Sequence, residues 1–392
     1  MTLPNSFTLT GKYLKPDGQF QHGTISIRDG IIEEVFSGKQ IQPGLSVPGL
    51  IVPGWLDVQI NGGYGFDFTF KPESASQVSH RLPETGVTGF LPTLITSEFG
   101  SYPARLEVIR GSIEKQRIEN SWSGARILGV HLEGPYLNPL RPGAHPIEYL
   151  RSITPDEVVA WADPRLVRVV TLAGELPGGF EAIRRLRENG IVVSLGHSDA
   201  DYLQAKECFS HGVGWATHLF NAMRPLHHRE PGLIGAILEN DLPCGIIVDG
   251  IHVHPSLVKL AYRVKGKDRI VLVTDAMEAL GMPAGQYSLS QKTVIVSDQD
   301  ARLPDGTLAG SLLSMDQAVR NMVTFSGCSL SEAVQMASLN PARLLGIDHV
   351  FGKIAPGYQA DLVILNEKIQ PTLTMIAGKI VYQSSTMKTE YA

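Results

Sequence analysis

Five residues with catalytic chemistry follow apolar runs of this sequence. Glu133, His197, His218, His252 and Asp275 come at the ends of ILGVHLEG, IVVSLGHS, VGWATHLF, CGIIVDGIH and RIVLVTDAM. One histidine at such a place is more often structural, but five such residues together indicate a site. Two histidines and a glutamate bind a catalytic metal and leave one position for water. With Asp275 as a base for that water, the set suits hydrolysis of an amide or ester.

Two amide side chains close another apolar run, GWLDVQINGG. Gln59 and Asn61 are two residues apart, so on a strand they share one face. Carboxamides are poor divalent-metal ligands beside imidazoles, but they hydrogen-bond well to a water or a carboxylate. Two interpretations stay open, since the amides either belong to the site or only satisfy buried backbone groups.

These polar residues can form one site only if the fold brings the ends of their strands together, and the sequence predicts such a fold. Eight apolar runs are continuous rather than alternating, as in a parallel sheet covered by helices. Helices are predicted between them over residues 154–162, 178–190 and 199–212, from Pro155 at a helix start and Gly190 at a helix end. Eight β/α units over about 250 residues predict an α/β fold with a (β/α)8 barrel, whose catalytic groups lie at the C-terminal strand ends. An open doubly wound sheet is the alternative, but no nucleotide-binding glycine pattern follows the first strand.

Both ends of the chain are instead rich in short strand-like runs. Asp29-Gly30 lies between two of them and predicts a hairpin turn. The C-terminal segments GKIAPGYQADLVILN and LTMIAGKIVYQ have the same character. The termini are therefore expected to form β structure outside the barrel.

The amino-acid composition indicates which partners the protein is not suited to bind and in which cellular compartment it is expected. The 392 residues are 43% hydrophobic and carry a net charge of −5 without blocks of like charge, which argues against nucleic acid or an anionic membrane as partner. Three widely spaced cysteines fit no disulfide framework and favour a reducing compartment. Without an apolar signal core or a membrane-spanning run, we expect a cytoplasmic protein.

Seven motifs in one order resemble a known family. GVHLEGPYLNP, SLGHSDA, ATHLFNAM, REPGLIGA, DGIHVHP, LVTDAM and LAGSLLSM are similar to the N-acetylglucosamine-6-phosphate deacetylases of the amidohydrolase superfamily. The resemblance implies a metal-dependent (β/α)8 barrel at residues 53–350 and a small β-sandwich domain built from residues 1–52 and 351–392. It also implies a homodimer that removes acetate from N-acetyl-D-glucosamine 6-phosphate to give D-glucosamine 6-phosphate.

The resemblance further implies roles for individual residues. Glu133, His197 and His218 would bind the metal, with zinc expected first and iron, cobalt or manganese also suited. Asp275 would act as general base and then acid, and His145 would polarise the acetyl carbonyl. Arg229 would grip the phosphate, reaching across the dimer interface, since a guanidinium can hold two phosphate oxygens. The other implied substrate contacts are Ala144, His145, Asn221, Ala222, Asp249, Gly250, Ile251, His252, Leu308, Ala309 and Gly310.

The amides give the resemblance a specific consequence. Many amidohydrolases, including some of these deacetylases, hold a further metal with two histidines where Gln59 and Asn61 stand here. One divalent metal per subunit is therefore expected, with the two amides in supporting or vestigial positions.

Three alternative functions stay open. A cyclic amidase such as a dihydroorotase shares the barrel but usually needs the histidine pair and a carboxylated lysine. A deacetylase for another amino-sugar phosphate, such as N-acetylgalactosamine 6-phosphate, shares nearly every motif. A non-catalytic binding scaffold would be favoured by loss of Asp275 or a metal ligand, and all four are present.

Overall fold

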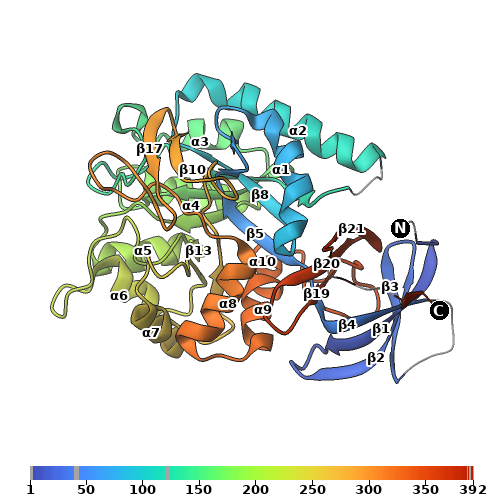
Figure 1. Ribbon diagram of the computed structural model, residues 1–392. Coiled ribbons are helices and arrows are strands. Elements are labelled where there is room, and N and C mark those ends of the chain that lie inside the picture. Colours follow the sequence, from blue (N-terminus) through green and yellow to red (C-terminus); the bar gives the residue numbers. More distant parts are fainter. Residues whose placement is uncertain (1–2, 39–43, 120–122, 386, 388–389, 392) are drawn as a thin grey trace.

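The central sheet forms from eight strands that are buried on both faces. The computed structural model describes residues 3–38, 44–119, 123–385, 387 and 390–391. β5 (Trp55–Ile60) and β8 (Val87–Ile95) contain only buried residues, as expected for a parallel sheet with helices outside. The remaining strands follow in chain order, in parallel, and confirm the predicted (β/α)8 barrel (Figure 1): β10 (Val130–Glu133), β11 (Val167–Leu172), β12 (Val192–Leu195), β13 (Trp215–Ala216), β14 (Cys244–Ile246) and β15 (Ile270–Leu272).

The barrel is closed where its first and last strands meet. The ladder pairs of the described residues run from β15 round to β5 but do not join these two strands directly. Residues just beyond β15 complete the ring instead. The Asp275 N–H donates to the Gln59 carbonyl at 2.8 Å, and the Asn61 N–H donates to the Ala276 carbonyl at 2.8 Å.

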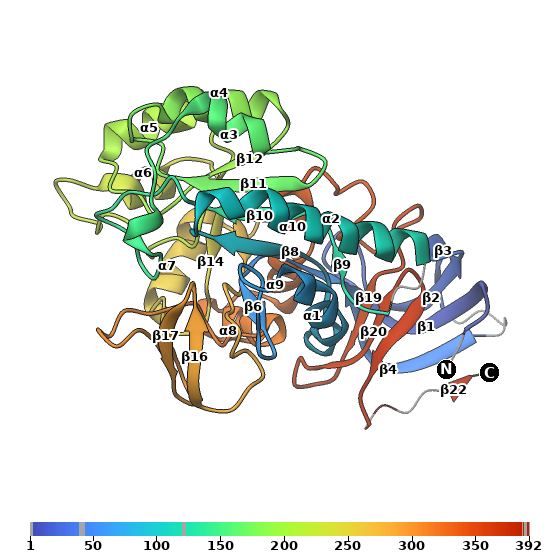
Figure 2. The ribbon, with the colours of Figure 1, turned by 90° about the horizontal axis from the view of Figure 1, so that it is seen from above.

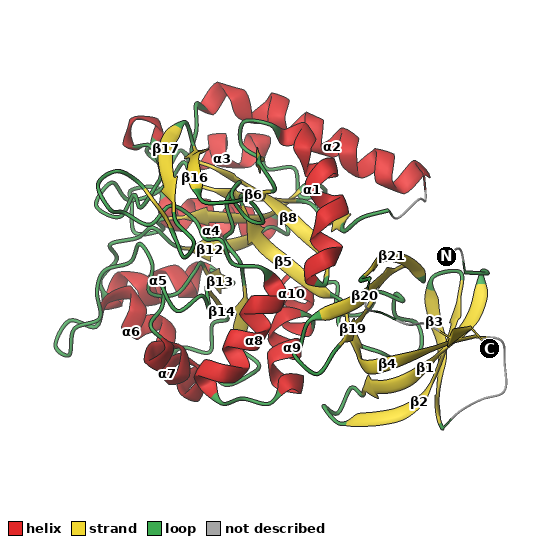
Figure 3. Cartoon of the chain, viewed as in Figure 1, coloured by secondary structure: helices red, strands yellow, loops and turns green. Residues whose placement is uncertain are grey.

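Helices cover the outside of the barrel (Figure 3). α4 buries Ala182, Ile183 and Leu186, which share one helical face. α5 begins with a capping box, in which the Asp201 carboxylate accepts from the Gln204 N–H at 2.8 Å. Among the described residues, no helix has the length and apolar character needed to cross a membrane. The helices are α1 (Ala75–Arg81), α2 (Tyr102–Glu119), α3 (Pro155–Trp161), α4 (Gly179–Glu188), α5 (Tyr202–His211), α6 (Gly232–Glu239), α7 (Pro255–Lys265), α8 (Met315–Ser326), α9 (Leu330–Ala337) and α10 (Leu339–Leu344).

The two termini build a separate eight-stranded sheet beside the barrel. Asp29 and Gly30 have φ of 50° and 80°, which confirms the predicted hairpin turn. This sheet has its own apolar core, and a buried ion pair between Arg126 and Asp361 ties it to the barrel. The boundaries at residues 52/53 and 350/351 stay a prediction. The strands are β1 (Ser6–Leu14), β2 (Phe20–Arg28), β3 (Ile31–Ser37), β4 (Gly44–Pro53), β19 (Leu362–Leu365), β20 (Pro371–Ile376), β21 (Lys379–Gln383) and β22 (Glu390–Tyr391).

Additional short strands lie in the segments that connect the barrel strands. β16 (Gly285–Leu289), β17 (Lys292–Val296) and β18 (Ala301–Arg302) form an antiparallel sheet after β15, and β6 (Gly62–Gly63) pairs with β7 (Phe66–Asp67) after β5. Figure 2 shows the β16–β17 hairpin set apart from the terminal sheet. β9 (Arg126–Ile127) pairs in parallel with Gly89 and Phe90 of β8.

Candidate active site

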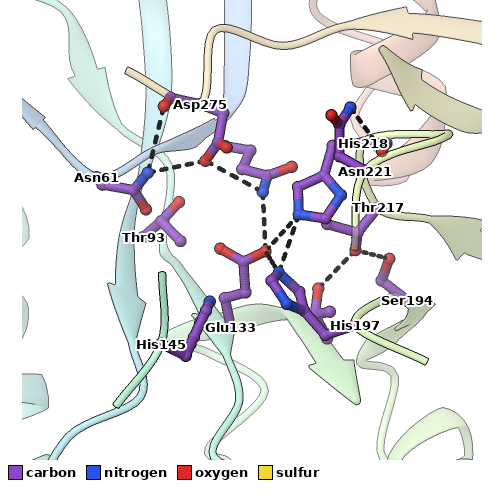
Figure 4. Close-up of polar contacts among 12 residues, drawn as sticks. Asn61, Thr93, Glu133, His145, Ser194, His197, Thr217, His218, Asn221 and Asp275 are labelled. Atoms are coloured by element: carbon purple, nitrogen blue, oxygen red, sulfur yellow. Dashed lines mark hydrogen bonds and ion pairs between the residues drawn. The ribbon is translucent and has the colours of Figure 1, made fainter. Parts of the chain in front are cut away.

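The predicted catalytic side chains converge at one end of the barrel. Glu133 is the last residue of β10, and His197, His218 and Asp275 lie just beyond β12, β13 and β15. Because the strands are parallel, their C-terminal ends open on the same side. Figure 4 shows these four side chains grouped around a common centre.

Glu133, His197 and His218 form a compact set of metal donors. The Oε1 atom of Glu133 lies 3.3 Å from His197 Nε2 and 3.1 Å from His218 Nε2. The two Nε2 atoms are themselves 3.1 Å apart. All three residues are buried, so the donor atoms are shielded from bulk water.

The protonation of His197 fits a divalent cation at this point. Its Nδ1 lies 3.0 Å from the backbone carbonyl of Arg141, which can only accept a hydrogen bond. Nδ1 therefore carries the proton, and the lone pair of Nε2 faces Glu133 and His218. The set then presents a carboxylate oxygen and imidazole nitrogens to one point, the donor chemistry of a catalytic zinc-type site.

The charges of this cluster compensate one another. Burial is the largest single influence on Glu133 and would raise its pKa, but the hydrogen bonds and charges of His197 and His218 hold the pKa well below its usual range. Burial likewise opposes the charged form of His218, yet Glu133 raises the pKa of that ring above its ordinary value. Glu133 is therefore kept as a carboxylate, the form that binds a cation.

The backbone at three site residues is strained. His197, His218 and Asp275 have φ of 48°, 23° and 49°, in a region that residues with a Cβ rarely occupy. Such conformations cost about 1–3 kcal/mol each and cluster at functional sites. Here they turn the chain sharply as it leaves a strand.

Asp275 is held by the two amides that the sequence singled out. Its Oδ1 accepts from Asn61 Nδ2 at 2.8 Å and from Gln59 Nε2 at 3.3 Å. Gln59 Nε2 also donates to Glu133 Oε1 at 3.0 Å, so this amide links both carboxylates. Burial, and secondarily the charge of Glu133, raise the pKa of Asp275 to about 6. A carboxylate with that pKa suits proton transfer near neutral pH.

His145 is fixed as a neutral hydrogen-bond donor. The Thr96 N–H, which can only donate, lies 3.3 Å from His145 Nδ1, and the Thr96 hydroxyl is 2.8 Å away. Nδ1 is therefore the acceptor and Nε2 carries the proton. Burial is the main cause that lowers the pKa of His145 well below its ordinary value, which keeps the ring neutral.

A cavity of about 200 Å³ opens over these groups. Its lining includes the three metal donors together with Asn61, His145 and Asp275. It also includes other predicted substrate contacts and some residues that the sequence did not single out. The predicted contacts at its wall are Ala144, Asn221, Ala222, His252, Leu308 and Gly310. The added lining residues are Ile95, Gly143, Leu289 and Thr307.

Other predicted contacts lie outside the lining. Asp249 orients His252, because its carboxylate lies 2.6 Å from His252 Nδ1 and accepts from the backbone N–H of Ile251 and His252. The cavity wall also leaves out Gly250, Ile251 and Ala309, of which Ile251 and Ala309 stand next to lining residues in the chain.

Arg229 is not brought into this cavity by its own chain. The residue is exposed, and its guanidinium contacts the ring of His228 at 3.0 Å. It lines a different surface hollow, together with residues such as Tyr202 and Arg224. Its phosphate contact therefore stays a prediction.

Besides the four added lining residues, Thr96 and Arg141 belong to the site without having been indicated by the sequence. Thr96 contacts Nδ1 of His145, and the Arg141 carbonyl contacts Nδ1 of His197, so each fixes the orientation of one ring. Thr96 could have been noticed because it follows the end of β8, as Asp275 follows β15. Arg141 acts through its backbone carbonyl, so its side chain gave no signal.

Comparison with known proteins places this geometry in a family. The amidohydrolase family matches residues 50–381. The chain is 39% identical to N-acetylglucosamine-6-phosphate deacetylase of Bacillus subtilis (strain 168) over 93% of its length and 94% of that protein. It is 40% identical to N-acetylgalactosamine-6-phosphate deacetylase of Escherichia coli O157:H7, over 84% of its length and 87% of that protein.

A solved structure agrees with these relatives. A mutant N-acetyl-D-glucosamine-6-phosphate deacetylase from Mycobacterium smegmatis, in complex with N-acetyl-D-glucosamine-6-phosphate, superposes with a TM-score of 0.87 at 32% identity, covering 96% of this chain and 100% of that chain. The chain therefore belongs to the amidohydrolase family, and within it to the N-acetylglucosamine-6-phosphate deacetylases and their relatives.

Proposed function

We propose that this protein hydrolyses the acetamide of N-acetyl-D-glucosamine 6-phosphate to acetate and D-glucosamine 6-phosphate, in amino-sugar catabolism or recycling. The observation that carries the proposal is the buried convergence of Glu133, His197 and His218 beside Asp275. The named activity of relatives that match nearly the whole chain supports it. A complete site also speaks against a non-catalytic scaffold.

The metal site would hold one divalent cation through Glu133, His197 and His218. Zinc is our first choice, because the set has one carboxylate and two imidazoles; iron, cobalt and manganese accept the same donors. A cation bound there supplies Lewis-acid chemistry, polarising a carbonyl and lowering the pKa of water.

Asp275 and His145 would carry the proton chemistry of this chain. Asp275 takes a proton as water attacks the acetyl carbon, and then delivers it to the leaving amine. The Nε2–H of His145 donates to the acetyl oxygen as negative charge develops there. Gln59 and Asn61 hold the Asp275 carboxylate in place. Their amide oxygens have no protein partner among the described residues, so they can accept from a water.

The sugar phosphate would be held by the cavity wall and by a second subunit. Ala144, Asn221, Ala222 and His252 line the cavity beside the reacting groups, while Leu308 and Gly310 form its other wall. We propose a homodimer in which Arg229 reaches the partner's cavity. An exposed apolar stripe on α7, made of Leu257, Leu260 and Val264, supports contact between subunits, since such faces mark interaction sites.

A cytoplasmic location is part of the same proposal. All three cysteines are buried as free thiols, which suits a reducing compartment.

The deciding experiment measures acetate release from N-acetyl-D-glucosamine 6-phosphate by the purified protein. We expect turnover that is lost after chelation and restored by a divalent metal. Turnover that survives complete removal of metal, or no acetate release by the metal-loaded protein, would reject the proposal.

A second candidate substrate is N-acetyl-D-galactosamine 6-phosphate, because a deacetylase of that name is 40% identical to this chain. The two sugars differ only in the configuration of one hydroxyl. Comparison of kcat/KM for both substrates under the same conditions decides between them.

A further inference from the structure

Asp57 is a buried carboxylate that the proposed mechanism does not use. It lies on β5, two residues before Gln59, and is 0% exposed. Its Oδ2 accepts from the Thr274 hydroxyl at 2.5 Å, and its Oδ1 accepts from the Thr274 N–H at 3.3 Å. Among the described residues no lysine, arginine or histidine pairs with it. A buried carboxylate without a cation is expensive, so its presence at this place needs a reason.

Asp57 Oδ1 also accepts from the Gln59 N–H of its own strand at 3.3 Å, but its partner across the seam, Thr274, stands immediately before the proposed general base. Thr274 follows β15, and Asp275 comes next with its strained φ of 49°. This is the seam of the barrel, where no ladder joins β5 to β15 in the described chain. The Asp57–Thr274 contact therefore links the two sides of the seam through side chains. It lies next to the hydrogen bond from the Asp275 N–H to the Gln59 carbonyl.

The Thr274 hydroxyl has three contacts, and all of them bear on the turn at Asp275. It donates to Asp57, lies 3.5 Å from the Gln59 carbonyl of β5, and accepts from the Ala276 N–H at 3.3 Å. On the opposite side, the Ser311 hydroxyl donates to the Thr274 carbonyl at 2.5 Å and the Ser311 N–H donates to the Asp275 carbonyl at 2.9 Å. The strained turn is thus fixed from β5 through one hydroxyl and from Ser311 through another.

We propose that Asp57 and Thr274 are positioning residues. Their contact, which we call the clasp, joins β5 to the segment after β15 and holds the Asp275 carboxylate in line with the attacking water. The inference rests on the proposed role of Asp275. Gln59 and Asn61 orient the carboxylate end of that side chain, and the clasp fixes its backbone. A general base needs both, because a small misplacement of a reacting group removes much of the rate.

The test replaces the Thr274 hydroxyl and compares two variants. Thr274→Val removes the hydroxyl with little change of shape, and Thr274→Ser keeps it. We expect Thr274→Val to lower kcat by roughly 10- to 100-fold, the scale of a misplaced reacting group, with little change in KM or metal content. Thr274→Ser should recover most of that kcat. Asp57→Asn, which offers one acceptor oxygen instead of two, should lower kcat in the same way.

A matched control separates positioning from general stability. Thr88 is also 0% exposed, and its hydroxyl donates to the Trp55 carbonyl of β5 at 3.3 Å. Thr88→Val should lower the melting temperature without lowering kcat. The double variant Asp57→Asn/Thr274→Val should lose no more kcat than Thr274→Val alone, because partners in one contact are not additive.

Three results would overturn the inference: wild-type kcat in Thr274→Val, no recovery in Thr274→Ser, or an equal loss of kcat in Thr88→Val. Failure of Asp57→Asn to fold leaves the Thr274 pair to decide. The proposed function fails differently. If Asp275→Asn were fully active, the base assignment would fall whatever the Thr274 variants do, whereas an inactive Asp275→Asn with a normal Thr274→Val rejects the clasp alone.

Discussion

We predict the number of metals per subunit from the direction in which the amides of Gln59 and Asn61 point. Gln59 Nε2 donates to Glu133 at 3.0 Å and to Asp275 at 3.3 Å, and Asn61 Nδ2 donates to Asp275 at 2.8 Å. To bind a second cation beside Glu133, both amides would have to turn their oxygens toward it. That rotation gives up all three hydrogen bonds to carboxylates.

The geometry sets the size of this penalty. Hydrogen bonds to charged groups contribute about 1.5–3 kcal/mol each, so three of them are worth roughly 4.5–9 kcal/mol. Since 1.4 kcal/mol is a factor of ten, a second metal would bind roughly three to six orders of magnitude more weakly than without this loss. Repulsion from the first cation acts in the same direction. We expect one tightly held metal per subunit in the unmodified protein.

The perturbation is the double substitution Gln59→His/Asn61→His, which supplies two imidazole ligands. Metal content should rise towards two per subunit, because imidazole suits zinc, iron and cobalt. Elemental analysis after removal of loosely bound metal measures it, and Gln59→Ala/Asn61→Ala is the control that removes the amides without adding ligands and should stay at one. Two tightly bound equivalents in the unmodified protein would refute the reasoning, since the amides would then be ligands.

Three further predictions concern the base, the phosphate and a buried acid. Asp275→Asn should keep its metal and fold, because the amide retains an oxygen for Asn61, but lose roughly two to four orders of magnitude in kcat; steady-state kinetics within a few-fold of wild type would remove Asp275 from the mechanism. Arg229→Ala should penalise the phosphorylated sugar over N-acetylglucosamine by about 1.5–3 kcal/mol, or one to two decades in kcat/KM; an equal loss on both sugars would mean that Arg229 does not read phosphate. Burial raises the pKa of Asp67 from 3.8 to about 6, against the opposing backbone donors of residues 69 and 70. Its protonated form is therefore favoured by folding, and the stability it contributes is full below pH 3.8 and is lost as pH rises through about 6, by about 3 kcal/mol. Asp67→Asn lacks this loss, so denaturant unfolding should show its stability relative to wild type growing between pH 4 and 6 and constant above; a difference independent of pH would contradict the assignment.

The outline of the fold and the grouping of Glu133, His197 and His218 could be predicted from the sequence. Continuous apolar runs such as those of β5 and β8 occur where both faces of a parallel sheet are buried. Parallel strands then bring their C-terminal ends to one side. Polar residues at those ends, such as Glu133 and His218, must therefore share a site, and residue type alone indicated its chemistry.

The arrangement of contacts around those donors depended on the tertiary structure. His197 gains its ligand tautomer from the carbonyl of Arg141, and His145 gains its tautomer from Thr96. Arg229, which the motif linked to phosphate, lines a different hollow from the cavity over the donor set. Side-chain identity does not say which distant backbone group will lie opposite a ring nitrogen.

The sequence by itself determined which residues gather, because strand periodicity and parallel topology are properties of local runs. Only the tertiary structure decided what each residue touches. The amide of Gln59 meets Glu133 and Asp275, and the carboxylate of Asp57 meets Thr274, across separations of 74 to 217 residues. These contacts between residues far apart in the sequence form because the first and last strands close the barrel, and no local pattern encodes that closure.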